Sequence, residues 1–106
     1  MSRNIPDDGF QVDLQRYRDL ISATIDYLNI KMHGSVEAPG ETADFFLILK
    51  READYFYEQG HLLKLRRLLY DLTELPRESK DESFNQYIAH TTGHRFDVFS
   101  FGYKRP

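Results

Sequence analysis

Apolar residues recur three or four positions apart from Asp13 to His33, with polar residues between them. This spacing places the apolar side chains on one face of a helix. The residues of that face are Leu14, Tyr17, Leu20, Ile21, Ile25, Leu28 and Met32. Gly34 follows at once, and glycine readily adopts the left-handed conformation that ends many helices. The pattern therefore predicts a helix over 13–33.

The middle of the chain predicts two more helices. Thr42 can cap a helix over 42–59, which Gly60 ends. The next helix covers 61–75 and is predicted to stop at Pro76, because a residue before proline disfavours the helical conformation. The short turn between the two makes them antiparallel neighbours. Their apolar faces comprise Phe45, Phe46, Leu49, Ala53, Phe56 and Tyr57 in the first, and Leu62, Leu65, Leu68, Leu69, Leu72 and Leu75 in the second.

A shorter fourth helix is predicted from the sequence that follows Pro76. Ser79 and Glu82 have the spacing of a capping box, in which each side chain bonds a free backbone N–H at the helix start. Apolar residues at helical spacing continue to Thr92, and Gly93 is placed to end the helix. The prediction is a helix from Ser79 to Thr92 with Ser79 at its N-cap.

The two ends of the chain are predicted to lie outside the helices. Residues 1–12 contain helix breakers and are expected to form an irregular lead-in. Residues 94–106 carry aromatic side chains at many positions and are expected to form a short C-terminal extension, either a strand or a tail. Four helices indicate the all-α class, and the simplest packing is an antiparallel four-helix bundle in one domain over 1–106.

Composition narrows the class of protein. The 106 residues are 41% apolar and 29% charged, as expected of one globular domain. The absence of Cys excludes disulfides, thiolate zinc sites and iron–sulfur clusters. No apolar run is long enough to span a membrane, and the first residues lack the apolar core of a signal peptide. We therefore expect a cytoplasmic protein without membrane contact.

Two predicted helices carry apolar residues outside their main apolar faces. Ile48 and Tyr55 are seven residues apart on one helix, and Leu63 and Tyr70 repeat this arrangement on the next. Such residues can pack against another helix of the bundle, since a bundle helix touches two neighbours. They can also form a surface for a partner or a second copy, where Tyr is favoured. The predicted interface consists of these four residues.

A basic cluster offers a second candidate surface. Lys64, Arg66 and Arg67 lie within one predicted helical turn and could contact the phosphates of a nucleic acid. The net charge of −3, from 14 basic and 17 acidic residues, argues against strong general binding to nucleic acid. Asp71 follows Arg67 by four residues, a spacing typical of an ordinary surface ion pair. A solvated helix face is therefore the alternative.

The histidines suggest two kinds of chemistry. The segment from His61 to Lys64 resembles part of the phosphoacceptor motif of histidine phosphotransfer domains, His-x-Leu-Lys-Gly, although Leu65 replaces the glycine. The resemblance implies that His61 carries a phosphoryl group and that Lys64 steadies it. His90 and His94 have the spacing of two metal ligands on a helix, but the intervening glycine is predicted to end that helix. No metal site is therefore predicted.

No pattern in the chain predicts catalysis. A phosphate-cradling glycine loop, a nucleophile elbow and a recognisable Ser-His-Asp order are all missing from the sequence. We therefore expect no catalytic residues and no cofactor. The predicted function is a non-catalytic interaction or regulatory module, such as an adaptor, an inhibitor or an immunity-type protein, that binds a protein partner or itself. The alternatives are a nucleic-acid-binding regulator and, third, histidine phosphotransfer.

Overall fold

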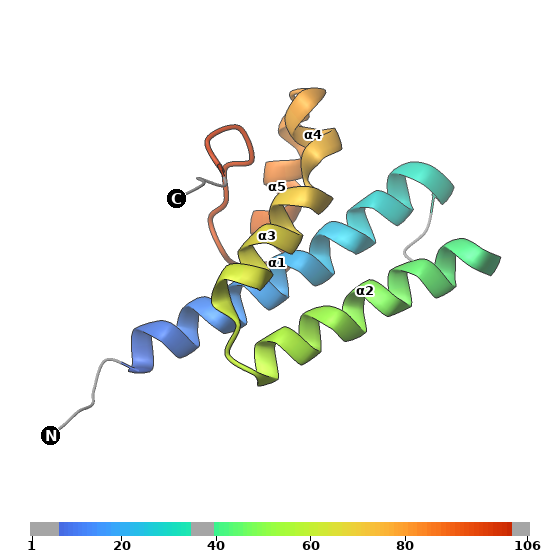
Figure 1. Cartoon of the computed structure of the whole chain (residues 1–106). Coiled ribbons are helices and arrows are strands. Elements are labelled where there is room, and N and C mark those ends of the chain that lie inside the picture. The colour runs from blue at the N-terminus through green and yellow to red at the C-terminus, as the bar shows by residue number, and fades with distance from the viewer. Residues whose placement is uncertain (1–6, 35–39, 103–106) are drawn as a thin grey trace, which may run out of the picture.

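A computed structural model describes residues 7–34 and 40–102 of the chain (Figure 1). These residues form five helices, so the all-α prediction is confirmed. No strand occurs among the described residues. The helices are α1 (Asp7–His33), α2 (Gly40–Glu58), α3 (Leu62–Leu72), α4 (Glu74–Glu78) and α5 (Glu82–Thr92).

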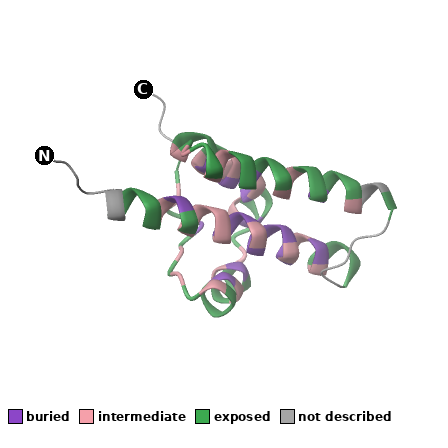
Figure 2. Cartoon of the chain, turned by 90° about the horizontal axis from the view of Figure 1, so that it is seen from below, coloured by how far each residue is buried: buried purple, intermediate pink, exposed green. Residues whose placement is uncertain are grey.

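Helix α1 lies at the centre of the fold. It packs against α2, α3 and α5, and α2 packs in turn against α3. Figure 2 shows the resulting concentration of buried residues along α1. In Figure 1, α1 and α2 run alongside each other, whereas α3 and α4 rise steeply away from them. An antiparallel four-helix bundle is therefore not confirmed.

The predicted irregular lead-in over 1–12 is wrong for its second half, because α1 already begins at Asp7. The Phe10 ring lies against Gly60 in the turn between α2 and α3, so a tertiary contact supports the added helical turns. A glycine within a helix costs only about 1 kcal/mol, and Gly9 is therefore tolerated there. Residues 1–6 lie outside the described part of the chain.

The prediction that Pro76 ends the third helix is also wrong. Helix α3 stops at Leu72, and Pro76 lies at the third position of the short helix α4, for which Thr73 is the N-cap. The first backbone N–H groups of a helix have no partner within it, so proline loses nothing at this position. The buried Thr73 hydroxyl donates a 2.8 Å hydrogen bond to the Leu69 carbonyl and so joins the two helices.

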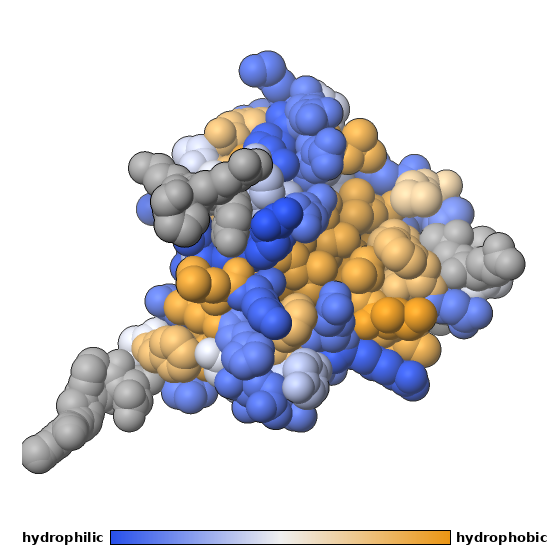
Figure 3. Space-filling model, in the orientation of Figure 1, coloured by the Kyte–Doolittle hydropathy of each residue, from blue (hydrophilic) through white to orange (hydrophobic). Residues whose placement is uncertain are grey.

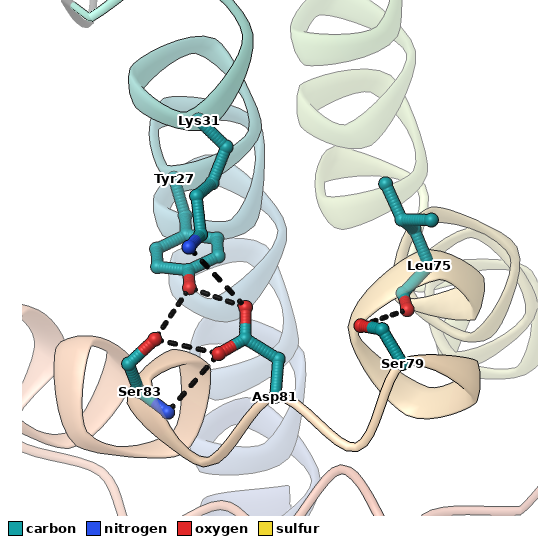
Figure 4. A network of polar contacts seen from close by, with 6 residues as sticks. All are labelled: Tyr27, Lys31, Leu75, Ser79, Asp81 and Ser83. Atoms are coloured by element: carbon teal, nitrogen blue, oxygen red, sulfur yellow. Dashed lines mark hydrogen bonds and ion pairs between the residues drawn. The ribbon is translucent and has the colours of Figure 1, made fainter.

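Helix α5 is capped by a different residue from the one predicted. Asp81 is its N-cap and accepts a hydrogen bond from the Ser83 backbone N–H at 3.2 Å. Ser79 instead ends α4, where its hydroxyl donates to the Leu75 carbonyl at 2.8 Å (Figure 4). The capping-box spacing thus marked the right region but the wrong residue, because two helix ends meet within three positions.

The C-terminal segment over 94–102 is packed on the helices without forming a strand. Val98 is fully buried, and its backbone N–H donates to the Asn85 side-chain carbonyl of α5 at 2.9 Å. The rings of Phe96 and Phe101 lie 5.1 Å apart and pack against the core. The segment is therefore part of the folded unit. Residues 103–106 of the predicted extension lie outside the described part.

Gly93 ends α5 in the left-handed conformation, as predicted, with a φ of 75°. Replacing Gly93 with alanine is expected to lower the free energy of unfolding by about 1 kcal/mol, because a Cβ atom disfavours this φ. Gly102→Ala is the control, since Gly102 does not have a positive φ and its Cβ would meet no atom. Urea titration of both variants checks the prediction, and equal stabilities would contradict it.

Candidate protein interaction surface

A groove with apolar walls lies where the end of α1, the start of α2 and the α3–α4 junction meet. Its volume is about 350 Å³, and in Figure 3 hydrophobic side chains gather over this region. Met32 and Phe45 are each 57% exposed, and Leu75 is 62% exposed. The floor is more buried and is formed by Leu28, Phe46 and Leu72. Three large apolar side chains thus surround one hollow at the surface.

The three exposed residues all belong to the apolar helix faces that the spacing identifies. Membership of such a face did not bring burial for Met32, Phe45 and Leu75. Each lies near a helix end or junction, where neighbouring helices diverge and no longer cover the apolar face. Spacing along the sequence shows which face is apolar but not how far along that face the neighbouring helix extends.

Carboxylates form one rim of the groove. Asp71, Glu74 and Glu78 all line it and are all exposed. An oxygen of Asp71 lies 3.4 Å from the Arg67 Nε atom, an ion pair on the surface of α3. Glu74 and Glu78 are four residues apart on α4, so they lie on one side of it. No ion pair of either glutamate occurs among the described residues, so the rim carries negative charge beside an apolar hollow.

Two of the four predicted interface residues lie on α2, the helix that carries Phe45, although neither lines the groove. Ile48 and Tyr55 are both exposed on α2. Ile48 is one helical turn beyond Phe45, and Tyr55 is two turns beyond Ile48. Their exposed fractions of 62% and 56% do not fit the alternative in which they pack in the core. They extend the exposed apolar surface along α2, and their role in binding stays a prediction.

The other two predicted interface residues lie on a different side of the molecule. The Tyr70 ring contacts the Phe101 ring at 6.2 Å, and the Arg77 guanidinium lies 3.9 Å from the Tyr70 ring centre. Leu63 is two turns before Tyr70 and shares that side of α3. Lys64, on the side of α3 that faces α2, is separated from Tyr70 by roughly 120°. The structure therefore does not bring all four residues together.

The basic cluster does not form a single surface either. The Lys64 ammonium lies 5.5 Å from the Phe56 ring centre on α2. Arg67 pairs with Asp71, at the spacing noted in the sequence. Arg66 points to another side, where its Nη2 atom donates to the Gly102 carbonyl at 3.0 Å. Arg66 therefore diverges from Lys64 and Arg67, and one phosphate-binding face shared by all three is not what their geometry favours.

The histidines are dispersed over the described residues. His61 lies at the N-cap of α3 with its ring 6.1 Å from that of Phe56. His94 follows α5, and its Nε2 atom lies 3.3 Å from an Asp19 carboxylate oxygen of α1. Within 7–34 and 40–102, no three His, Asp or Glu side chains are grouped to hold a metal ion. The Phe56 ring beside His61 does not add support to the hypothesis that His61 carries a phosphoryl group.

Comparison with known proteins gives no family for the chain. No protein-family model matches it, and neither a curated protein nor a solved structure does so. Among the helices of the described ranges, none has the length and apolar character needed to cross a membrane.

Proposed function

We propose that this protein is a non-catalytic cytoplasmic interaction module that binds an amphipathic helix of a protein partner in the groove beside Met32, Phe45 and Leu75. The observation that carries the proposal is the exposure of these three side chains around one hollow. A helix that enters such a groove presents apolar residues three, four and seven positions apart. Adaptors and inhibitors commonly use this kind of contact.

The charge of the rim favours one kind of helix. Asp71, Glu74 and Glu78 line one side of the groove, so Lys or Arg residues flanking the apolar stripe of the partner would meet opposite charge. The Arg67–Asp71 pair removes part of this charge, which leaves Glu74 and Glu78 as the main acidic contacts. Ile48, one turn from Phe45, supplies further apolar area for a longer helix.

The experiment is affinity capture from a lysate of the source cell, with nuclease present, followed by mass spectrometry and measurement of binding to the captured protein. Phe45→Ser combined with Leu75→Ser is expected to weaken binding at least about tenfold, because truncating central apolar anchors commonly costs more than 1 kcal/mol each. Glu74→Lys combined with Glu78→Lys is expected to weaken it as well, and most strongly at low salt.

Leu63→Ser is the matched control. Leu63 is 66% exposed on α3, close to the 62% of Leu75 on α4, but it does not line the groove. Binding should be unchanged in this variant. A partner lost with Leu63→Ser and retained with the groove variants would instead assign the interface to the Leu63–Tyr70 side and overturn the groove. A dimer in sedimentation that the groove variants abolish, with no partner captured, would assign the groove to a second copy of the chain.

A further inference from the structure

A second hollow lies on the side of α3 that faces away from α2. It has a volume of about 770 Å³ and is bounded by the C-terminal segment, which loops past α3 in Figure 1. Arg16 of α1, Arg66 of α3 and Arg95 of the C-terminal segment all line it. Three arginines from distant parts of the sequence therefore line one cleft, which we call the arginine cleft.

The arginines have unused bonding capacity. Arg66 donates from Nη2 to the Gly102 carbonyl, but its Nε atom is buried without a hydrogen-bond partner. Arg95 is exposed and has no ion pair among the described residues. Arg16 lies only at the edge of ion-pair distance from Asp13, at 4.0 Å.

One carboxylate also lines the cleft, but it is engaged in holding the backbone. An Asp97 oxygen accepts hydrogen bonds from the Phe99 backbone N–H at 3.0 Å and from the Asn85 side chain at 3.4 Å. With one carboxylate set against three guanidinium groups, the lining carries two more positive charges than negative charges. A phosphate monoester carries nearly two negative charges at neutral pH, and guanidinium groups match its oxygens in pairs.

Aromatic side chains make up the apolar part of the lining. The Phe96 and Phe101 rings lie 5.1 Å apart, and the Arg66 guanidinium lies 5.6 Å from the Phe101 ring centre. A lining of aromatic rings with a few converging polar groups is typical of a small-molecule site, as is a volume of several hundred Å³. We propose that the arginine cleft binds a small organic phosphate, with the phosphate on Arg66 and Arg95 and the organic part on Phe96 and Phe101.

Titration calorimetry of the full chain with phenyl phosphate, inorganic phosphate and benzoate tests this proposal. Phenyl phosphate should bind most tightly, inorganic phosphate more weakly because it lacks the apolar part, and benzoate more weakly because it carries a single charge. Arg95→Gln should weaken phenyl phosphate binding about tenfold, the effect of removing one charged hydrogen bond. Backbone amide signals of 95–102 should shift on titration in NMR spectra.

Arg51→Gln is the control, since Arg51 is exposed on α2 and its replacement changes the net charge equally. Its affinity for phenyl phosphate should stay within about twofold of the original. Because Arg95 is exposed and forms no ion pair within 7–34 and 40–102, Arg95→Gln should unfold at the original temperature. Equal affinity for inorganic and phenyl phosphate would overturn the role of the rings. Tighter binding of benzoate, an unchanged Arg95→Gln affinity or no binding of any probe would each overturn the site.

Discussion

Replacing Phe84 with alanine is expected to lower the free energy of unfolding by about 3–5 kcal/mol, the usual cost of truncating a buried phenylalanine. The Phe84 side chain on α5 is fully buried. Its ring meets the Tyr27 ring of α1 edge-on at 5.2 Å and the Phe96 ring of the C-terminal segment at 6.2 Å. Because two separate segments pack against this ring from outside α5, they cannot easily close the cavity that its removal leaves.

Phe99→Ala is the matched control for this prediction. Phe99 lies in the same C-terminal region but is 39% exposed, and the change should cost less than about 1 kcal/mol. Guanidinium titration of the two variants, followed by far-UV circular dichroism, measures both losses. Similar values for Phe84→Ala and Phe99→Ala would mean that the C-terminal segment does not pack on α5 as described.

The helices could be predicted from the sequence because their signals are local. The apolar period of three to four residues located α1, α2, α3 and α5, and Gly93 marked a true left-handed end. Gly34 did so too, with a φ of 78°. Errors arose where two signals compete within a few residues. Pro76 was interpreted as a stop although it lies in the first turn of α4, and Ser79 was chosen as a cap over Asp81.

The surfaces could not be predicted in the same way, because they depend on how helices cross. Phe45 and Leu75 belong to apolar stripes whose residues elsewhere are covered, and only the divergence of the helices exposes them. The arginine cleft draws residues from positions 16, 66 and 95, which no spacing rule connects. Ile48 and Leu63 lie outside the main apolar faces, as the sequence predicts. Their spacing along the chain does not show, however, that the two residues face in different directions once α2 and α3 have packed.

The polar cluster around Asp81 is expected to make stability depend on acid pH. Burial alone would raise the pKa of Asp81, but hydrogen bonds from Ser83 and Tyr27, together with Lys31, outweigh burial and lower it (Figure 4). The Ser83 hydroxyl donates to one carboxylate oxygen at 2.6 Å, and the Tyr27 hydroxyl donates to the other. Burial and the bond to Asp81 raise the pKa of Tyr27, so the phenol keeps its proton at neutral pH.

Asp81→Asn should therefore destabilise the protein by about 2 kcal/mol at pH 7, through loss of charged hydrogen bonds at a helix cap. A carboxyl with a lowered pKa in the folded state contributes stability above its ordinary pKa of 3.8, and the contribution is lost as the pH falls through the folded pKa. The difference in unfolding free energy between Asp81→Asn and the original chain should consequently shrink below about pH 4.

Asp54→Asn, at an exposed position of α2, is the control, and its unfolding free energy should differ little from that of the original chain at any pH. Urea titrations between pH 3 and 7 measure this dependence, and a difference for Asp81→Asn that stays constant with pH would show that the carboxylate charge is not what stabilises the cap.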